Sequence, residues 1–186
     1  MKKIIQGIFG SMKFSDSIFL CVLIANLILV AYLGVGSHER ALKVGQTQAN
    51  GEQIIAWFEE FGQKLEANEL ATPESCIPSD EGAVSAKSAK LNIWKSCVET
   101  LFAEKGPFHS YTNLLMPKDP AYALKCDKQD LGTSGAFIFE KMTMNPAGPP
   151  SVGPMDPQEK LVSGMNFRLS LCDTGYYLIK IGEFKL

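Results

Sequence analysis

One uncharged, apolar stretch near the N-terminus constrains the fold of this chain more than any other feature. Residues Ile18 to Val35 read IFLCVLIANLILVAYLGV, and Asn26 is the only strongly polar side chain among them. As a helix rising ~1.5 Å per residue, the stretch would be ~27 Å long, which matches the hydrocarbon thickness of a bilayer. A helix also satisfies its own backbone hydrogen bonds in lipid. The stretch therefore predicts a single transmembrane helix over residues 17–36, after a tail of residues 1–16.

A cleaved signal peptide is the alternative interpretation of the same stretch. Lys2, Lys3 and Lys13 form a basic N-terminal region, and Gly34-Val35-Gly36 offers small residues for cleavage before Ser37. The apolar run is longer than the ~7–15 residues that a signal peptide uses. We therefore expect the segment to be retained as an anchor.

Two features orient the chain across the membrane. Basic flanks stay cytoplasmic; lysines outnumber Asp16 before the apolar stretch, whereas acidic residues outnumber basic ones after it. An even number of cysteines without metal-ligand spacing is typical of disulfides in an oxidising compartment, although free thiols in a cytosolic domain are the alternative. We expect a cytoplasmic N-terminus and a periplasmic or extracellular domain over residues 37–186. The four cysteines of that domain are Cys76, Cys97, Cys126 and Cys172.

The pairing of these cysteines is not determined by their spacing. Pairing of neighbours along the chain favours Cys76–Cys97 and Cys126–Cys172, and the other two connectivities stay open. In the chain-entropy treatment, loops of these sizes contribute roughly 3–4 kcal/mol each to stability.

Two helices are predicted before the sheet. Apolar residues recur at helical spacing from Leu42 to Leu65, with charged residues between them, so the membrane helix is expected to continue as an amphipathic helix to about Asn68. Glycine disfavours helix, and we expect a kink or break near Gly45 or Gly51. A second helix is predicted from about Ala83 to Lys105, with an apolar stripe of Leu91, Trp94, Val98 and Leu101 and with Cys97 beside it.

Short stretches rich in β-forming residues follow, and they predict a four-stranded antiparallel sheet. The strands are expected at residues 121–125, 135–143, 165–171 and 176–184, and Cys172-Asp173-Thr174-Gly175 indicates a hairpin between the last two. Residues 145–157 read NPAGPPSVGPMDP, which predicts a long exposed loop of polyproline character. The predicted fold class is therefore α+β.

The sequence contains no catalytic, metal-binding or nucleotide-binding motif, and we expect neither an enzyme nor a cofactor. No phosphate-binding loop, dinucleotide fingerprint or zinc motif is present. Gly132-Thr133-Ser134-Gly135 lacks the order of a nucleophile elbow, and we interpret it as a turn entering a strand. Cys97 with His109 could form a thiolate–imidazole pair, but a structural disulfide is the preferred interpretation. Asp127 and Asp130 could contribute to a Ca²⁺ loop, yet Lys128 interrupts them and a solvated turn is preferred.

A small set of side chains remains as candidates for contact with other molecules. Cys21 and Asn26 lie within the apolar stretch, where an amide can hydrogen-bond a neighbouring helix or its own helix. The aromatic residues Trp57, Trp94, Tyr122 and Tyr176 could line a ligand pocket or fill the core. With a net charge of −2, the chain lacks the basic surface that general nucleic-acid binding requires.

The predicted order of elements resembles that of type IV pilins and pseudopilins. These proteins have a long N-terminal helix, here about Ser15 to Asn68, and then a variable loop. A four-stranded antiparallel sheet follows, with a disulfide near the C-terminus, here Cys126–Cys172. The family's cleavage motif is absent, because Gly10 is followed by Ser11 and Ser15 stands where the family has glutamate. The resemblance implies a subunit of an envelope filament.

We therefore expect a membrane-anchored structural or interaction protein whose partners are other membrane or envelope proteins, including copies of itself. The first alternative is a single-pass accessory subunit of a membrane complex, in which Cys21 and Asn26 contact neighbouring helices. The second is an anchored ligand-binding or sensor domain.

Overall fold

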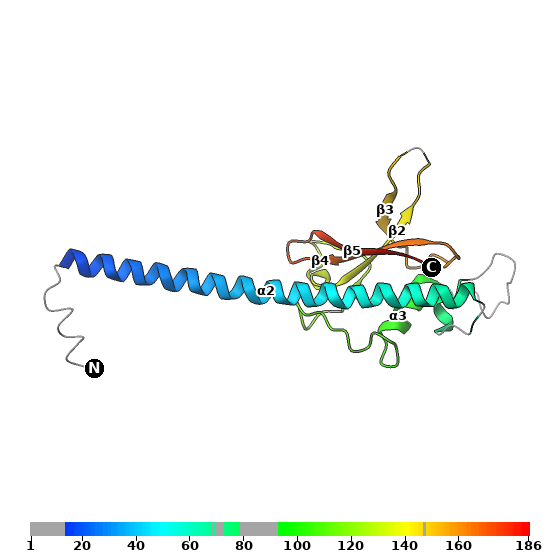
Figure 1. Cartoon of the computed structure of the whole chain (residues 1–186), viewed down its shortest axis with the longest axis horizontal. Coiled ribbons are helices and arrows are strands. Elements are labelled where there is room, and N and C mark those ends of the chain that lie inside the picture. Colours follow the sequence, from blue (N-terminus) through cyan, green and yellow to red (C-terminus); the bar gives the residue numbers. More distant parts are fainter. Residues whose placement is uncertain (1–13, 68, 70–72, 79–92, 147) are drawn as a thin grey trace. The chain divides into compact units, whose positions relative to one another are not determined.

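The computed structural model describes residues 14–67, 69, 73–78, 93–146 and 148–186, and it has the predicted α+β fold (Figure 1). The chain divides into two compact units, Met1–Leu42 and Lys43–Leu186, and we call the second unit the head. The elements in chain order are α2 (Phe14–Glu66), the 3-10 turn η1 (Glu74–Cys76), α3 (Trp94–Phe102), β1 (Tyr122–Ala123), the 3-10 turn η2 (Leu131–Thr133), β2 (Phe137–Thr143), β3 (Ser151–Pro154), β4 (Asn166–Cys172) and β5 (Leu178–Lys185).

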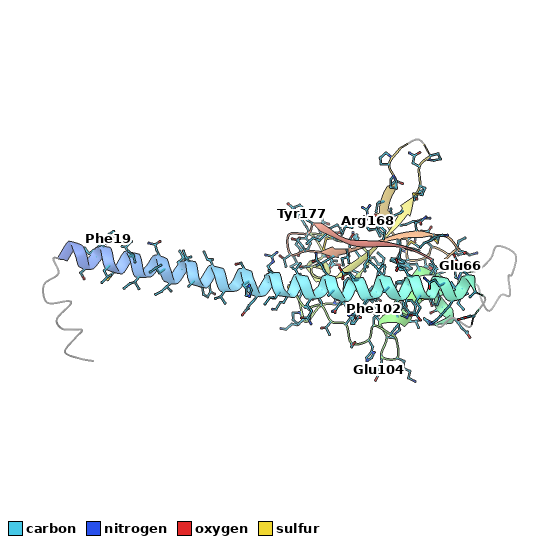
Figure 2. All side chains as sticks on the ribbon, in the orientation of Figure 1. Phe19, Glu66, Phe102, Glu104, Arg168 and Tyr177 are labelled. Carbon is cyan, nitrogen blue, oxygen red and sulfur yellow. A yellow bond between two sulfur atoms is a disulfide. The ribbon has the colours of Figure 1, made fainter. Side chains whose placement is uncertain are left out.

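The N-terminal part of α2 carries large apolar side chains that no other described part of the chain covers. Figure 2 shows them around the helix, and Phe19 and Tyr32 are 69% and 78% exposed. A contiguous apolar surface of this kind marks a site of contact with membrane or protein. Within the described ranges, α2 is also the one helix that is long and apolar enough to cross a membrane. This part of α2 therefore has the properties of a membrane anchor.

The predicted kink or break near Gly45 or Gly51 is wrong, because α2 is one continuous helix from Phe14 to Glu66. Gly51 is explained by packing. A Cβ atom at this position would lie 2.6 Å from Ile181 Cδ1 and 3.1 Å from Phe137 Cε1. The missing side chain lets the helix lie close against the sheet, which offsets the ~1 kcal/mol that glycine costs in a helix.

The sheet is mixed and has five strands, so the prediction of four antiparallel strands is wrong in two respects. The strand order is β1-β2-β4-β5, and β3 also pairs with β2. β1 runs parallel to β2, with Tyr122 opposite Phe137, whereas every other pair is antiparallel. The connection from β1 to β2 contains the turn η2 and brings the chain back, so that β2 runs in the same direction as β1. Local sequence patterns do not reveal the path of such a connection.

The additional strand, β3, lies inside the segment that was predicted to be an exposed loop. It pairs with β2 from Glu140 opposite Pro154 to Thr143 opposite Ser151. Proline lacks a backbone N–H and is confined to edge strands and strand ends. Pro154 is tolerated because it is the last residue of β3, which pairs on one side only. The polyproline prediction fails for this short stretch and stays untested for the rest of residues 145–157.

The second helix, α3, is shorter than predicted. Its predicted start near Ala83 lies outside the described residues, and its predicted end at Lys105 is wrong. The helix ends at Phe102 because Ala103 adopts an extended backbone and the chain then turns. The predicted apolar stripe is confirmed where it is described, by the buried residues Trp94, Cys97, Val98 and Leu101.

Both helices pack against the same face of the sheet. Phe58 of α2 stacks on Phe184 with ring centroids 4.5 Å apart and lies edge-on to Phe139 at 6.1 Å. Trp94 of α3 contacts the same Phe139 at 5.0 Å and stacks on Phe167 at 5.3 Å. Aromatic pairs in these geometries add ~0.5–1.5 kcal/mol each beyond the area that they bury. The core of the head is therefore largely an aromatic cluster between two helices and three strands.

The predicted hairpin between the last two strands is confirmed, with a longer turn than expected. β4 ends at Cys172 and β5 begins at Leu178. The side chain of Asp173 holds the turn, since Oδ1 accepts hydrogen bonds from the backbone N–H groups of Gly175 and Tyr177 at 2.7 and 3.0 Å. The residue with positive φ is Tyr176, at 61°, rather than the glycine before it.

Candidate binding pocket

A pocket of about 200 Å³ opens in the head between α3, the edge strand β1, β2 and the segment that precedes β4. It is a defined hollow with a mostly apolar wall rather than a flat surface. The apolar side chains that line it are Trp94, Val98, Tyr122, Leu124, Phe139 and Pro157.

One wall of the pocket is positioned by backbone hydrogen bonds to the start of α3. The first N–H groups of a helix have no partner within the helix. Here the N–H of Trp94 donates to the Glu159 carbonyl at 2.9 Å, and the N–H of Lys95 donates to the Pro157 carbonyl at 3.0 Å. These bonds hold Pro157 and Gln158 beside α3, where both line the pocket.

The floor of the pocket is aromatic and is part of the core of the head. Trp94 and Phe139 are 2% and 3% exposed and belong to the core cluster, so their positions are determined by packing. Tyr122 packs on Phe102 with ring centroids 4.9 Å apart. Burial raises the pKa of the Tyr122 hydroxyl, and the nearby negative charge of Glu99 raises it further. This hydroxyl therefore stays protonated at neutral pH and can donate or accept a hydrogen bond.

The charged side chains of the pocket neutralise each other. Lys95 Nζ lies 3.8 Å from Glu99 Oε1, one helical turn away, and both side chains are more than half exposed. Exposed pairs of this kind contribute little to stability. The pocket therefore presents an apolar floor and a rim without net charge, which suits an uncharged apolar group.

The four aromatic residues singled out in the sequence separate in the structure. Trp94 and Tyr122 line this pocket together, whereas Trp57 lies at another hollow, beside Pro73 and Thr100. Tyr176 lies in the turn between β4 and β5. Phe139 and Pro157 were not predictable as lining residues, because the first has the pattern of a core strand and the second that of a loop.

Both favoured cysteine pairs form disulfide bonds in the structure. Cys76 Sγ lies 1.97 Å from Cys97 Sγ and ties η1 to α3. Cys126 Sγ lies 1.99 Å from Cys172 Sγ and ties the segment after β1 to the end of β4. Cys21 is the remaining cysteine and is free and exposed.

The disulfide removes Cys97 from the list of candidate nucleophiles. A cysteine needs a free thiolate to act as a nucleophile, and this sulfur is bonded to Cys76. His109 instead contacts the Gly106 carbonyl, with its Nδ1 3.0 Å from that oxygen. The two residues therefore form no thiolate–imidazole pair.

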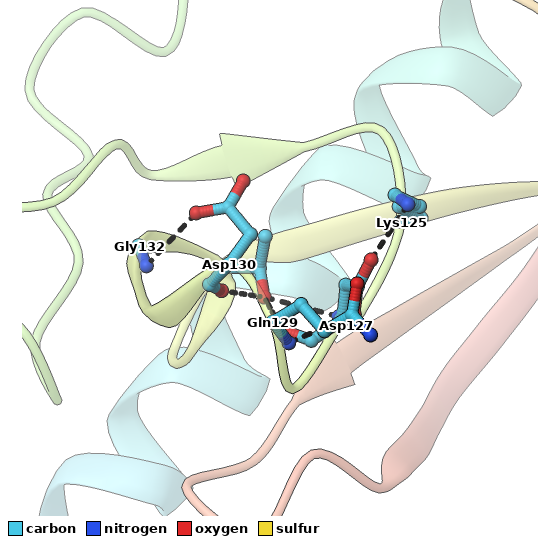
Figure 3. Close-up of polar contacts among 6 residues, drawn as sticks. Lys125, Asp127, Gln129, Asp130 and Gly132 are labelled. Carbon is cyan, nitrogen blue, oxygen red and sulfur yellow. Dashed lines mark hydrogen bonds and ion pairs between the residues drawn. The ribbon is translucent and has the colours of Figure 1, made fainter.

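The acidic loop after β1 is occupied by its own hydrogen bonds (Figure 3). Asp127 pairs with Lys125 at 2.6 Å and accepts a hydrogen bond from the N–H of Gln129, while Asp130 accepts one from the N–H of Gly132. The Lys125 ammonium and the Gln129 N–H both lower the pKa of the Asp127 carboxyl. No cluster of three metal-ligating side chains occurs within the part of the chain that the structure describes. These contacts stabilise the loop as a structural turn.

The face of the sheet opposite the helices carries a row of charged side chains. Glu140, Arg168 and Glu183 lie opposite one another on β2, β4 and β5. Glu140 is buried and accepts a hydrogen bond from the Ser170 hydroxyl at 2.7 Å, and Arg168 Nη2 lies 3.2 Å from Glu183 Oε1. Lys180 and, less strongly, Arg168 lower the pKa of Glu183. Glu140 and Glu183 are bonded within the sheet, whereas Nε of Arg168 is buried without a hydrogen-bond partner, and we assign no open site to this row.

The two residues proposed for helix contacts lie on the exposed N-terminal part of α2. The amide nitrogen of Asn26 donates to the Val22 carbonyl of its own helix at 2.8 Å. This bond satisfies the nitrogen internally and leaves Oδ1 able to accept a hydrogen bond from a neighbouring helix. The role of Cys21 and Asn26 in helix contacts stays a prediction.

Comparison with known proteins adds no relative, since no family profile, curated protein or solved structure matches this chain. The features of the molecule that bear on its function are therefore the apolar helix, the disulfide-bonded head and the aromatic pocket.

Proposed function

We propose that this protein is a membrane-anchored structural subunit whose head lies outside the cytoplasm and packs against other subunits of an envelope assembly. The assembly is pilin-like in its subunit architecture, and other copies of the chain are its main partners. The head supplies contacts rather than catalysis.

The observation that carries this proposal is the continuity of α2. One helix runs from Phe14 to Glu66, apolar and exposed at its start and buried in the head at Ile54, Phe58 and Phe61. The apolar run from Ile18 to Val35 is also longer than the ~7–15 residues that a cleaved signal peptide uses. A continuous helix suits a subunit whose anchor and head are both used in the mature assembly.

Two observations support a head outside the cytoplasm. Disulfides persist in oxidising compartments and are rare in the cytosol, and the head contains two. The lysines before the apolar stretch favour a cytoplasmic N-terminus. Both point to the same orientation.

A single-pass accessory subunit of a larger membrane complex is the second candidate. It is favoured by the polar Asn26 and the free thiol of Cys21 on an exposed apolar helix. Polar side chains in membrane helices commonly contact a neighbouring helix. In this candidate the neighbour is a different integral protein.

The molar mass of the complete chain in mild detergent tests the proposal. We expect particles whose protein mass is a multiple of 20.4 kDa, because the anchors and heads of several copies associate. Light scattering coupled to gel filtration measures this mass. A lone monomer at every protein concentration would contradict the proposal.

Mild oxidation before extraction separates the two candidates. Exposed thiols on adjacent helices form a disulfide when they meet. Self-assembly predicts a Cys21–Cys21 dimer on a non-reducing gel, and the accessory-subunit candidate predicts a mixed disulfide with another membrane protein. Cys21→Ser is the matched control and should remove either product.

A further inference from the structure

We propose that the aromatic pocket of one head receives the proline-rich tip of the β2–β3 hairpin of a second copy of this chain. The proposal deepens the proposed function, because it names a contact through which heads would associate. The tip contains the sequence Pro146-Ala147-Gly148-Pro149-Pro150.

The size of the pocket argues for a side chain as its occupant. Pockets that hold drug-sized ligands or cofactors are ~300–1,000 Å³. This one is about 200 Å³, so it suits one or two side chains of a protein partner. Trp94, Tyr122 and Phe139 give the pocket an aromatic lining, against which proline rings can pack.

The chain itself carries the complementary segment. Pro146, Pro149 and Pro150 lie in and directly after a turn in which the Gly148 N–H donates to the Asn145 carbonyl at 3.3 Å. Pro146, Pro149 and Pro150 are exposed, and the neighbouring Met144 is 65% exposed. Exposed apolar side chains at the tip of a hairpin are available for docking. No charged residue occurs from Met142 to Met155, which matches a pocket whose Lys95 and Glu99 neutralise each other.

The tip of a head cannot fill the pocket of the same head. β3 is held on β2 up to the pair Thr143–Ser151, so the tip begins four residues beyond Phe139 along β2. At ~3.3 Å per residue this separation is roughly 13 Å. The ladder continues along β2 beyond Phe139, and in Figure 1 the labelled β2–β3 pair projects from the rest of the sheet. The contact must therefore join different copies.

A tip on one copy meets a different surface on the next, so the contact is heterologous when copies join head-to-tail, whereas two copies that exchange tips reciprocally form a closed dimer. Heterologous contacts generate rings or open filaments rather than closed two-fold dimers. The head-to-tail arrangement therefore agrees with a subunit of an extended assembly.

A synthetic peptide of sequence TMNPAGPPS, which corresponds to residues 143–151, tests the contact directly on the full chain in detergent. We expect saturable binding that changes the tryptophan fluorescence, because Trp94 lies in the pocket. The matched control peptide, TMNSAGSSS, should bind at least ~10-fold more weakly since it lacks the proline rings. Equal binding of both peptides, or no binding of either, would overturn the proposal.

Substitutions locate the peptide on the head. Leu124→Asp places a charge in the pocket wall and should weaken peptide binding at least ~10-fold. Leu131→Asp is the matched control, because Leu131 is 68% exposed and does not line the pocket. Gln158→Asp provides a second pocket variant at an exposed position, in case Leu124→Asp disturbs folding. Binding that is unchanged in both pocket variants would contradict the assignment.

The same variants distinguish this contact from the proposed function. A wild-type chain that stays monomeric while the peptide binds would contradict self-assembly but support the recognition. A wild-type chain that assembles without binding the peptide, and whose Leu124→Asp variant assembles equally well, would overturn the contact and leave the proposed function in place.

Discussion

Replacing Cys126 and Cys172 together with serine is expected to lower the free energy of unfolding of the head by about 4 kcal/mol. The two residues are 46 positions apart, and the chain-entropy treatment gives roughly this value for a loop of that length. Because small domains are stable by only ~5–15 kcal/mol, a large share of the stability should disappear. Urea unfolding of the full chain in detergent, followed by tryptophan fluorescence, measures the loss.

The other cysteines provide graded controls for this prediction. The Cys76–Cys97 pair closes a separation of 21 residues, and replacing both with serine should cost roughly 3 kcal/mol. Cys21→Ser should leave the unfolding midpoint unchanged, because this thiol is free. An unchanged midpoint in the Cys126/Cys172 double variant would contradict a structural role for that bond.

Gly135→Ala is expected to destabilise the head by a similar amount, about 4 kcal/mol, for a reason unrelated to crosslinking. Gly135 has φ of 78°, a conformation that costs a residue with a side chain ~1–2 kcal/mol. A Cβ atom there would also lie 2.1 Å from Asn113 Oδ1 and 2.9 Å from Leu115 Cβ. The Asn113 side chain would have to move, and the same unfolding experiment measures the cost.

The displaced side chain is the centre of a buried hydrogen-bond network. Asn113 is 2% exposed. Its amide nitrogen donates to the carbonyls of Ser134 and Pro120 at 2.7 and 3.2 Å, and its oxygen accepts from the N–H groups of Leu115 and Met116. Leaving a buried polar group without its partner costs ~1–3 kcal/mol. This loss, added to the backbone strain, gives the expected magnitude.

Two other glycines separate the two contributions. Gly164 also has positive φ, 84°, but a Cβ atom there would meet only Lys185 Cε at 3.7 Å, so Gly164→Ala should cost the backbone strain alone. Gly153 has open space around it, and Gly153→Ala should change stability little. If all three variants lose the same stability, the clash with Asn113 is not the cause. An additive effect of Asn113→Ala and Gly135→Ala would also contradict the coupling.

Patterns that depend on local periodicity were predictable from the sequence. The helical spacing of Ile54, Phe58 and Phe61 indicated a buried helix face, and all three are buried. The alternation in β4 indicated a packed strand, and Phe167, Leu169 and Leu171 are fully buried. The apolar stretch around Asn26 appears as an exposed helix with the composition of an anchor. Each of these features follows from the nearest neighbours along the chain.

Features that depend on distant partners were not predictable. Gly51 indicated a helix break because glycine disfavours helix. Its actual role is to leave room for Ile181, a residue of β5 far along the chain. The parallel pairing of β1 depends on the path of the connection through η2, and β3 exists because β2 offers a free edge beyond β1. The pocket combines α3, two strands and Pro157, so aromatic composition could suggest Trp94 and Tyr122 but could not place them together.

The intact mass of the chain extracted from washed membranes tests the central claim most directly, if all accessible thiols are first alkylated in denaturant without reductant. The account predicts a membrane-bound protein that still contains residues 17–36 and carries one alkyl group, on Cys21, because the other four cysteines are paired. A mature chain that lacks those residues, or one that carries five alkyl groups, would contradict an anchored protein with an oxidised head.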